Sequence, residues 1–149
     1  MSDYAAVADE IRRELATASG ADDAMTRLVT VLKTRMPGYT WVGIYRREGT
    51  DLVLGPFLGK PSPHTRIPIG RGICGAAAAS KATIVVDDVN ADERYLACSM
   101  ETQSEIVVPV MRDGDVLAEI DVDSDMRAAF GRSDQALLEA AAALLAEKL

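Results

Sequence analysis

The chain has 149 residues, and 48% of them are hydrophobic, which is enough apolar material for one buried core. Asp and Glu number 23 against 16 Lys and Arg, so the formal net charge is -7, and the basic residues are scattered. An acidic surface without a basic patch repels phosphate groups, which argues against nucleic acids and anionic membranes as partners. We therefore expect a single domain over residues 1–149 that binds neither.

Two amphipathic helices are predicted at the start of the chain. Apolar residues recur at intervals of three and four over residues 4–15 and again over 25–32, and a Ser19-Gly20 breaker separates the two segments. The N-terminal region has no continuous apolar stretch of the length that a signal peptide or a membrane span requires. We expect a cytoplasmic protein.

The next segment alternates with a period of two, which is typical of strands. Residues 39–45 are expected to place Tyr39, Trp41 and Tyr45 on one face, and residues 51–57 are the expected hairpin partner. The aromatic face would supply an apolar or cation-contacting wall for a ligand.

Further strands and one helix are predicted after this hairpin. A short strand is expected over residues 83–89, two strands surround a turn at 112–115, and Ser133 is the expected N-cap of the last helix. Neighbouring strands joined by short turns imply a largely antiparallel sheet. The fold class is therefore α+β, with the terminal helices on one face and the other face left for a ligand.

The segment from Gly70 to Gly75, GRGICG, has the G-x-G-x-x-G spacing of a dinucleotide-binding loop. Such a loop follows a buried parallel strand, but Pro68 precedes this one and the rest of the chain predicts hairpins. We interpret it as a tight turn into a short alanine-rich helix. Cys74 would then lie in the first helical turn, where the dipole favours a thiolate, and the alternative is a buried, inert cysteine.

The strand at residues 117–123 alternates acidic and apolar side chains, which sends Glu119, Asp121 and Asp123 to one side. Glu105 is the only acid in the otherwise apolar strand before it. Two interpretations stay open. The acids form a solvated edge, or they line a cleft in which they bind an ammonium group and raise the pKa of at least one neighbour.

The chain contains two cysteines, Cys74 and Cys98, which are too few for a complete zinc knuckle. In a reducing compartment a bond between them would be transient and redox-linked. His64 would complete a three-ligand set, but the spacing matches no usual zinc pattern. The D-x-D pattern of Asp121 and Asp123 does not by itself specify a divalent cation. We predict no metal site.

Five separated segments, WVGIY, LVLGPFLGKP, RIPIGRGICGAAA, LACSMETQSEIVVP and IDVDS, resemble the GAF-domain family in order and spacing. Within that family they are most similar to the free methionine-(R)-sulfoxide reductases. The resemblance implies a six-stranded GAF sheet with a closed pocket, usually in a homodimer. The implied activity is reduction of free, not peptide-bound, methionine sulfoxide, with no cofactor and an external thiol reductant such as thioredoxin.

Position by position, the resemblance implies catalytic roles for Cys98, Glu105 and Cys74. Cys98 as a thiolate would attack the sulfoxide sulfur while Glu105 protonates the oxygen, which leaves methionine and a sulfenic acid. Cys74 matches a second family cysteine, and His64 stands where the family has its usual resolving cysteine. Recycling therefore needs Cys74 or an external thiol, unless efficient turnover has been lost.

The resemblance also implies substrate-binding positions, and these are Trp41, Tyr45, Asp121 and Asp123. The chain departs from the family pattern nearby, since Ala118-Glu119 replaces Gly-Val. The alternative function is a non-catalytic GAF module that binds a small molecule as a sensor. The missing resolving cysteine favours the sensor, and the joint presence of cysteine and carboxylates favours the enzyme.

Overall fold

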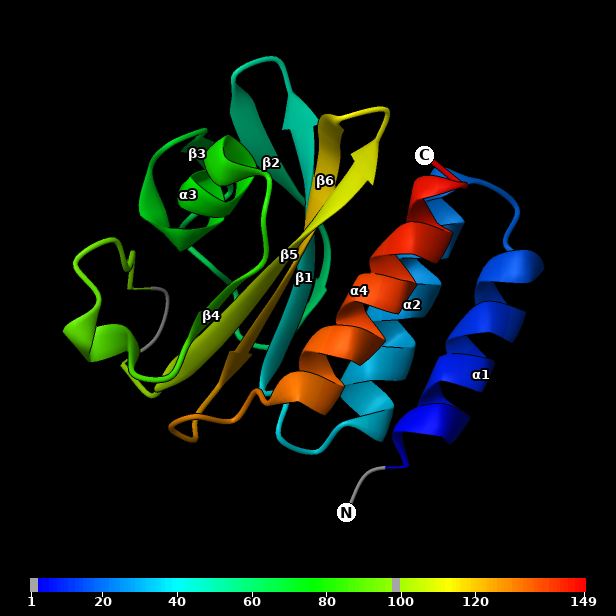
Figure 1. Cartoon of the computed structure of the whole chain (residues 1–149), viewed down its shortest axis with the longest axis horizontal. Helices are drawn as coiled ribbons and strands as arrows, with labels where there is room; N and C mark the ends of the chain where they lie inside the picture. The colour runs from blue at the N-terminus through cyan, green and yellow to red at the C-terminus, as the bar shows by residue number, and fades with distance from the viewer. Residues whose placement is uncertain (1–2, 98–99) are drawn as a thin grey trace.

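The computed structural model describes residues 3–97 and 100–149 (Figure 1). In chain order the elements are α1 (Tyr4–Ala16), α2 (Ala21–Arg35), β1 (Trp41–Glu48), β2 (Asp51–Leu58), β3 (Arg66–Pro68), α3 (Gly72–Ser80), β4 (Ile84–Val86), the 3-10 turn η1 (Val89–Ala91), β5 (Ser104–Arg112), β6 (Asp115–Ser124) and α4 (Arg132–Ala146). Within these described residues, six strands form one sheet in the order β3-β2-β1-β6-β5-β4, and every neighbouring pair is antiparallel. The predicted α+β architecture is confirmed.

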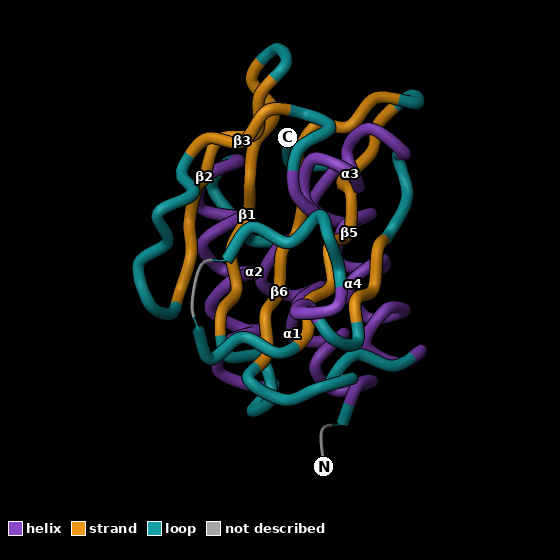
Figure 2. Tube along the Cα trace, turned by 90° about the vertical axis from the view of Figure 1, so that its left-hand side faces the viewer, coloured by secondary structure: helices purple, strands orange, loops and turns teal. Residues whose placement is uncertain are grey.

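The helices divide between the two faces of the sheet. Figure 1 shows α1, α2 and α4 side by side along one face, with α3 on the opposite face. Figure 2 looks onto the α3 side, where loops cross in front of the strands. The terminal helices therefore seal one face, as predicted, and a short helix with loops covers the other. Within the described chain, every helix is too short or too polar to span a membrane.

The helix-covered face is apolar because alternate residues of the central strands point to it. Val42 and Ile44 of β1 and Ile120 and Val122 of β6 are fully buried in one cluster with the inward stripes of α1, α2 and α4. Helix α1 begins after Asp3, whose side chain accepts a hydrogen bond from the Ala6 amide at 3.1 Å and so caps the helix. This core holds the sheet in place for the residues on its other face.

The structure corrects the prediction for Tyr39, which does not share a face with Trp41. The Tyr39 amide donates to the Met36 carbonyl at 2.9 Å, so the chain is still turning there, and the strand begins only at Trp41. Alternation therefore does not extend back to Tyr39. Its side chain lies in the helix-side core, where the hydroxyl donates to Asp134 at 2.7 Å.

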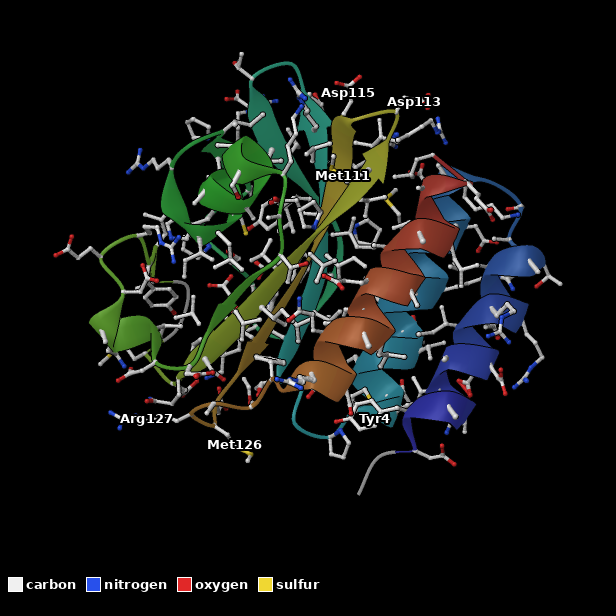
Figure 3. The ribbon with its side chains drawn as sticks, viewed as in Figure 1. Tyr4, Met111, Asp113, Asp115, Met126 and Arg127 are labelled. Carbon is white, nitrogen blue, oxygen red and sulfur yellow. The ribbon has the colours of Figure 1, made fainter. Side chains whose placement is uncertain are left out.

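The predicted N-cap of the last helix is also wrong by two residues. Helix α4 begins at Arg132 after the cap residue Gly131, so Ser133 lies inside the first turn. The Gly131 amide donates to the Asp134 carboxylate at 2.9 Å, which satisfies the helix end without a serine. Figure 3 shows Met126 and Arg127 in the loop that leads to this helix, at the opposite end of the sheet from Asp113 and Asp115 in the β5–β6 turn.

The GRGICG segment forms the predicted tight turn into a short helix. Gly70 and Gly72 have φ angles of 98° and 69°, which side chains rarely adopt, and α3 begins at Gly72. A Cβ on Gly75 would lie 2.7 Å from the Pro68 carbonyl oxygen, and one on Gly72 would lie 2.8 Å from the Leu96 side chain. The glycines therefore let α3 pack closely against β3 and the segment before residue 98.

Candidate functional site

Four buried acids lie together on the face of the sheet that α3 covers. Glu119, Asp121 and Asp123 alternate along β6, and Asp123 lies directly opposite Trp41 of β1 and Glu105 of β5. Residues paired across antiparallel strands share a face, so all five side chains project to the same side. The acids are between 0% and 6% exposed, which excludes the solvated-edge interpretation and supports the cleft.

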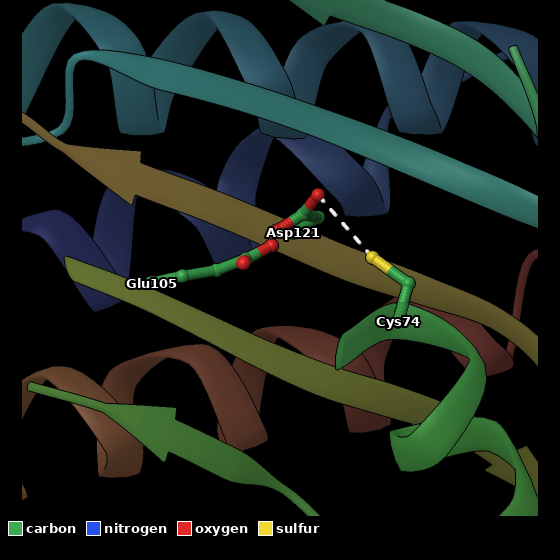
Figure 4. Close-up of side chains that lie close together, drawn as sticks. All are labelled: Cys74, Glu105 and Asp121. Carbon is green, nitrogen blue, oxygen red and sulfur yellow. Dashed lines mark hydrogen bonds between the residues drawn. The ribbon is translucent and has the colours of Figure 1, made fainter. Parts of the chain in front are cut away.

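Helix α3 holds Cys74 over these acids (Figure 4). The Cys74 thiol donates a hydrogen bond to Asp121 Oδ2, with Sγ and Oδ2 3.3 Å apart. Burial, followed by the negative charges of Asp121, Glu105 and Glu119, raises the pKa of Cys74 well above its ordinary value. Of the two alternatives for Cys74, the dipole-stabilised thiolate is therefore wrong, because desolvation and three nearby carboxyl groups outweigh the helix terminus.

Burial raises the pKa of three of these acids, Glu119, Asp121 and Asp123. Burial, and then the charge of Asp121, raises the pKa of Glu119 to about 9. Burial also raises the pKa of Asp121 and, together with the charge of Asp121, that of Asp123. Among the buried polar side chains of the described residues there is no Lys or Arg. No buried protein cation in the described part of the chain therefore balances these carboxyl groups.

Glu105 is placed to share a proton with two aspartates. Hydrogen bonds with Glu105 lower the pKa of both Asp121 and Asp123, against the raising effect of burial. A hydrogen bond between two carboxyl groups requires that one of them be protonated. The arrangement therefore keeps a transferable proton among these three groups, in a site closed to bulk water.

Aromatic side chains form one wall of the site. The Trp41 ring lies over Gly43, where a Cβ would approach it to 2.3 Å, and stacks on Phe57 with ring centroids 5.7 Å apart. The Trp41 indole N–H donates to the Lys60 carbonyl at 3.0 Å, and the Tyr45 hydroxyl donates to the His64 carbonyl at 2.7 Å. Both rings thereby hold the loop between β2 and β3 against the site.

Two cavities adjoin the cluster. The larger has a volume of about 230 Å³, and it is lined by Thr40, Trp41, Lys60, Glu101, Thr102, Asp123 and Asp125. The smaller has about 20 Å³ and is lined by Tyr45, His64, Ile67, Gly72, Ile73, Cys74, Leu96, Glu105 and Asp121. A wider groove of about 510 Å³ runs between α4, β5 and the end of α3, but none of the four acids lines it. The chemistry is therefore concentrated at the two smaller spaces.

The remaining candidates are His64 and Cys98. The His64 ring lies 3.1 Å from the Ala97 carbonyl through Nε2, so this half-buried loop residue contacts the segment that precedes Cys98 in the sequence. Cys98 itself lies outside the described residues, so its catalytic role stays a prediction and a bond between Cys98 and Cys74 stays an open question. The three-ligand set of His64, Cys74 and Cys98 likewise falls partly outside them.

Sequence reasoning placed Glu119 on the correct side of β6 but not among the site residues. Glu119 is fully buried, and its two carboxyl oxygens have no hydrogen-bond partner among the described residues. The available signal was its position two residues before Asp121, on the same face of the strand. What sequence could not reveal is that α3 covers this part of the strand.

Comparison with known proteins gives a consistent family assignment. The GAF domain family model matches residues 3–149. A free methionine-R-sulfoxide reductase from Saccharomyces cerevisiae is 41% identical over 109 residues, which cover 70% of this chain and 60% of that protein. The chain spans between 60% and 70% of the lengths of the curated relatives that it matches.

Solved structures are similar over nearly the whole chain. A free methionine-R-sulfoxide reductase from Neisseria meningitidis, solved in complex with its substrate, has a TM-score of 0.94 at 37% identity, covering 99% of this chain and 91% of that one. A protein from Burkholderia vietnamiensis that is described as a GAF sensor has a TM-score of 0.91 at 35% identity, with coverage of 97% and 92%.

Proposed function

Because the chain belongs to the GAF-domain family, and its relatives include free methionine-R-sulfoxide reductases, we propose that it reduces free methionine-(R)-sulfoxide to methionine. The observation that carries the proposal is the buried cluster of Cys74, Glu105 and Asp121 beside a pocket of about 230 Å³. Pockets for drug-sized ligands measure about 300–1,000 Å³, so this one suits a single amino acid better than a nucleotide.

The larger cavity supplies groups for the amino-acid end of the substrate. Asp123 lines it, and Asp123 Oδ1 is buried with no hydrogen-bond partner among the described residues, so it is available for an ammonium group. Trp41 forms the adjoining apolar wall for the methionine side chain. Tyr45 and Asp121 line the smaller cavity next to it, toward which the sulfoxide would point.

The reduction step transfers two electrons from a cysteine to the sulfoxide. The Cys98 thiolate attacks the sulfoxide sulfur, and Glu105 donates its shared proton to the sulfoxide oxygen. The sulfur–oxygen bond of the substrate then breaks and the hydroxyl passes to Cys98, so methionine leaves and Cys98 becomes a sulfenic acid. Burial supports this role of Glu105, since a proton held among three closed-in carboxyl groups is not lost to solvent.

Recycling requires a second thiol, and Cys74 is the candidate that this chain retains. The Cys74 thiol donates a hydrogen bond to Asp121, so Asp121 would take this proton as Cys74 attacks the Cys98 sulfenic acid and would pass it to the hydroxide that leaves. The products are a disulfide and water, and an external dithiol such as thioredoxin then reduces the disulfide. His64 carries no thiol and so does not replace the family's resolving cysteine.

A sensor function is the second candidate, and one observation favours it. Cys74 is buried and its pKa is raised, so the cysteine is a poor nucleophile in the resting protein. A non-catalytic domain would use the same pocket to bind an amino acid without turnover. The similarity to a GAF sensor protein is compatible with this alternative.

An assay of sulfoxide reduction separates the two functions. The wild-type chain is supplied with free methionine-(R)-sulfoxide, once with dithiothreitol and once with thioredoxin and its reductase. We expect turnover in both, its loss in Cys98→Ser, and loss of only the thioredoxin-dependent turnover in Cys74→Ser. A peptide that contains methionine sulfoxide serves as the control substrate and should not react. Binding of the free amino acid without turnover under either reductant would instead favour the sensor.

A further inference from the structure

We infer that Cys74, Glu105 and Asp121 form a binding site for a thiophilic divalent cation such as Zn²⁺, although the sequence alone predicted no metal site. One ligand atom from each side chain lies within 4.8 Å of the others, and all three residues are buried. Figure 4 shows the three side chains converging from α3, β5 and β6. Cation binding at this place needs no turnover, so the inference stands apart from the proposed reductase activity.

The spacing of the ligand atoms matches that of a zinc site. Zinc lies about 2.3 Å from a cysteine sulfur and about 2.0–2.2 Å from a carboxylate oxygen, so a tetrahedral ion holds the two ligand atoms about 3.5 Å apart. Cys74 Sγ and Asp121 Oδ2 are already 3.3 Å apart. A small movement of Glu105 would bring its oxygen to the same ion, which leaves the fourth position for water.

The cavity between these residues has the size of a metal ion with one water. Its volume is about 20 Å³, and a cavity needs about 10–15 Å³ of probe-filled space to hold a water molecule. Such a space excludes the six to eight oxygen ligands that Ca²⁺ takes and the hydration shell that Mg²⁺ retains. A site with one sulfur and two oxygen ligands instead favours Zn²⁺ or Co²⁺.

A second observation points to a missing cation. Asp121 is almost completely buried and lines the small cavity, yet its Oδ1 atom has no hydrogen-bond partner among the described residues. A buried acceptor without a donor is costly, and no Lys or Arg is buried in the described part of the chain to serve as its partner. A divalent cation in the small cavity would give the Asp121 carboxylate the positive partner that it lacks.

Metal binding exchanges protons for the ion. The sulfur–metal bond forms as the sulfur–hydrogen bond of Cys74 breaks, and that proton passes to the buffer. If the proposed reductase function is correct, the bound ion would also block the sulfoxide position and remove Cys74 from recycling. Zn²⁺ would then inhibit turnover, an effect that rests on the proposed function and is read out separately.

Titration with Co²⁺ tests the site in the full-length, reduced protein in a buffer free of thiols and chelators. We expect a sulfur-to-cobalt charge-transfer band in the wild type and, undiminished, in Cys98→Ser. The band should disappear in Cys74→Ser. Asp121→Asn keeps the sulfur ligand and should weaken Co²⁺ binding at least about tenfold. If circular dichroism shows that Cys74→Ser does not fold, the affinity of Asp121→Asn tests the site in its place.

Four results would each overturn the inference. One is the absence of a charge-transfer band in the wild type at millimolar Co²⁺. The others are a band that persists in folded Cys74→Ser, a band that disappears in Cys98→Ser, and unchanged affinity in Asp121→Asn. The titration contains no sulfoxide or reductant, so none of these results bears on the reductase assay. Conversely, a protein that binds Co²⁺ through Cys74 but reduces no sulfoxide would refute only the proposed function.

Discussion

On the helix-covered face of β6, Ala118, Ile120 and Val122 pack into an apolar core, whereas on the α3-covered face Glu119, Asp121 and Asp123 are nearly as deeply buried. Hydrogen bonding is the main difference between these faces. The buried acid on the helix side, Asp134, accepts hydrogen bonds from two tyrosines and a backbone amide. Glu119 has none from the described residues. The helix-covered face therefore stabilises the fold, whereas the α3-covered face buries polar groups at a cost in stability and leaves them available to a ligand.

Truncation on the helix side should have the largest effect. Ile120→Ala removes a fully buried side chain from the centre of that core and should destabilise the fold by about 2–5 kcal/mol. Urea unfolding followed by circular dichroism measures the loss. A change below about 1 kcal/mol would contradict the view that this face carries the stability.

Glu119→Gln should act in the opposite direction and stabilise the protein. The pKa of Glu119 is raised from 4.5 to about 9, so its contribution to stability is complete below pH 4.5 and is lost as the pH rises toward 9. At pH 7 the loss extends over about 2.5 pH units, or roughly 3 kcal/mol at 1.36 kcal/mol per unit. Glutamine does not ionise and avoids this loss.

The measurement is the free energy of unfolding of both proteins from pH 4 to pH 9, in the presence of a chelator. The two curves should meet near pH 4 and separate steadily above it. Parallel curves would mean that Glu119 ionises in the folded protein as easily as in the unfolded chain. Glu93→Gln, at an exposed loop position, is the control for the same chemical change outside the site.

Tyr39→Phe should have a smaller effect. It removes the donor at 2.7 Å from Asp134, which retains the hydrogen bonds from Tyr4 and Gly131. The expected cost is about 1–2 kcal/mol, because the bond is buried and its acceptor keeps other donors. Thermal unfolding measures it. The matched change on the other face, Tyr45→Phe, removes a bond to a loop carbonyl and should alter ligand binding more than stability.

The smallest effect is expected at the rim of the larger pocket. Lys60 forms an ion pair with Glu101 across that rim, and both side chains are more than half exposed. Exposed pairs contribute about 0–1 kcal/mol and are weakened by salt, so Lys60→Met should leave the unfolding free energy nearly unchanged. A loss above 2 kcal/mol would show that the pocket rim, and not only the helix-side core, holds the fold together.

The sequence predicted the secondary-structure elements better than the tertiary contacts around each residue. Alternation along β6 correctly divided Ile120 and Asp121 between two faces, because the period of a strand depends only on its backbone. It could not show that α3 covers Asp121, since that depends on contacts between segments far apart in the chain. The same limit explains the error for Cys74, whose pKa is raised by burial and by acids from two other elements. Tyr39 was misplaced because a local turn, not the alternation, decides where β1 begins.

The two edge strands of the sheet have a consequence for assembly. Both edge strands, β3 and β4, are only three residues long, and β3 ends at Pro68, which cannot donate a backbone hydrogen bond. A second chain that tried to extend the sheet would find too short a template for stable pairing. We therefore expect these two short strands not to serve as templates for edge-to-edge growth when the protein is concentrated.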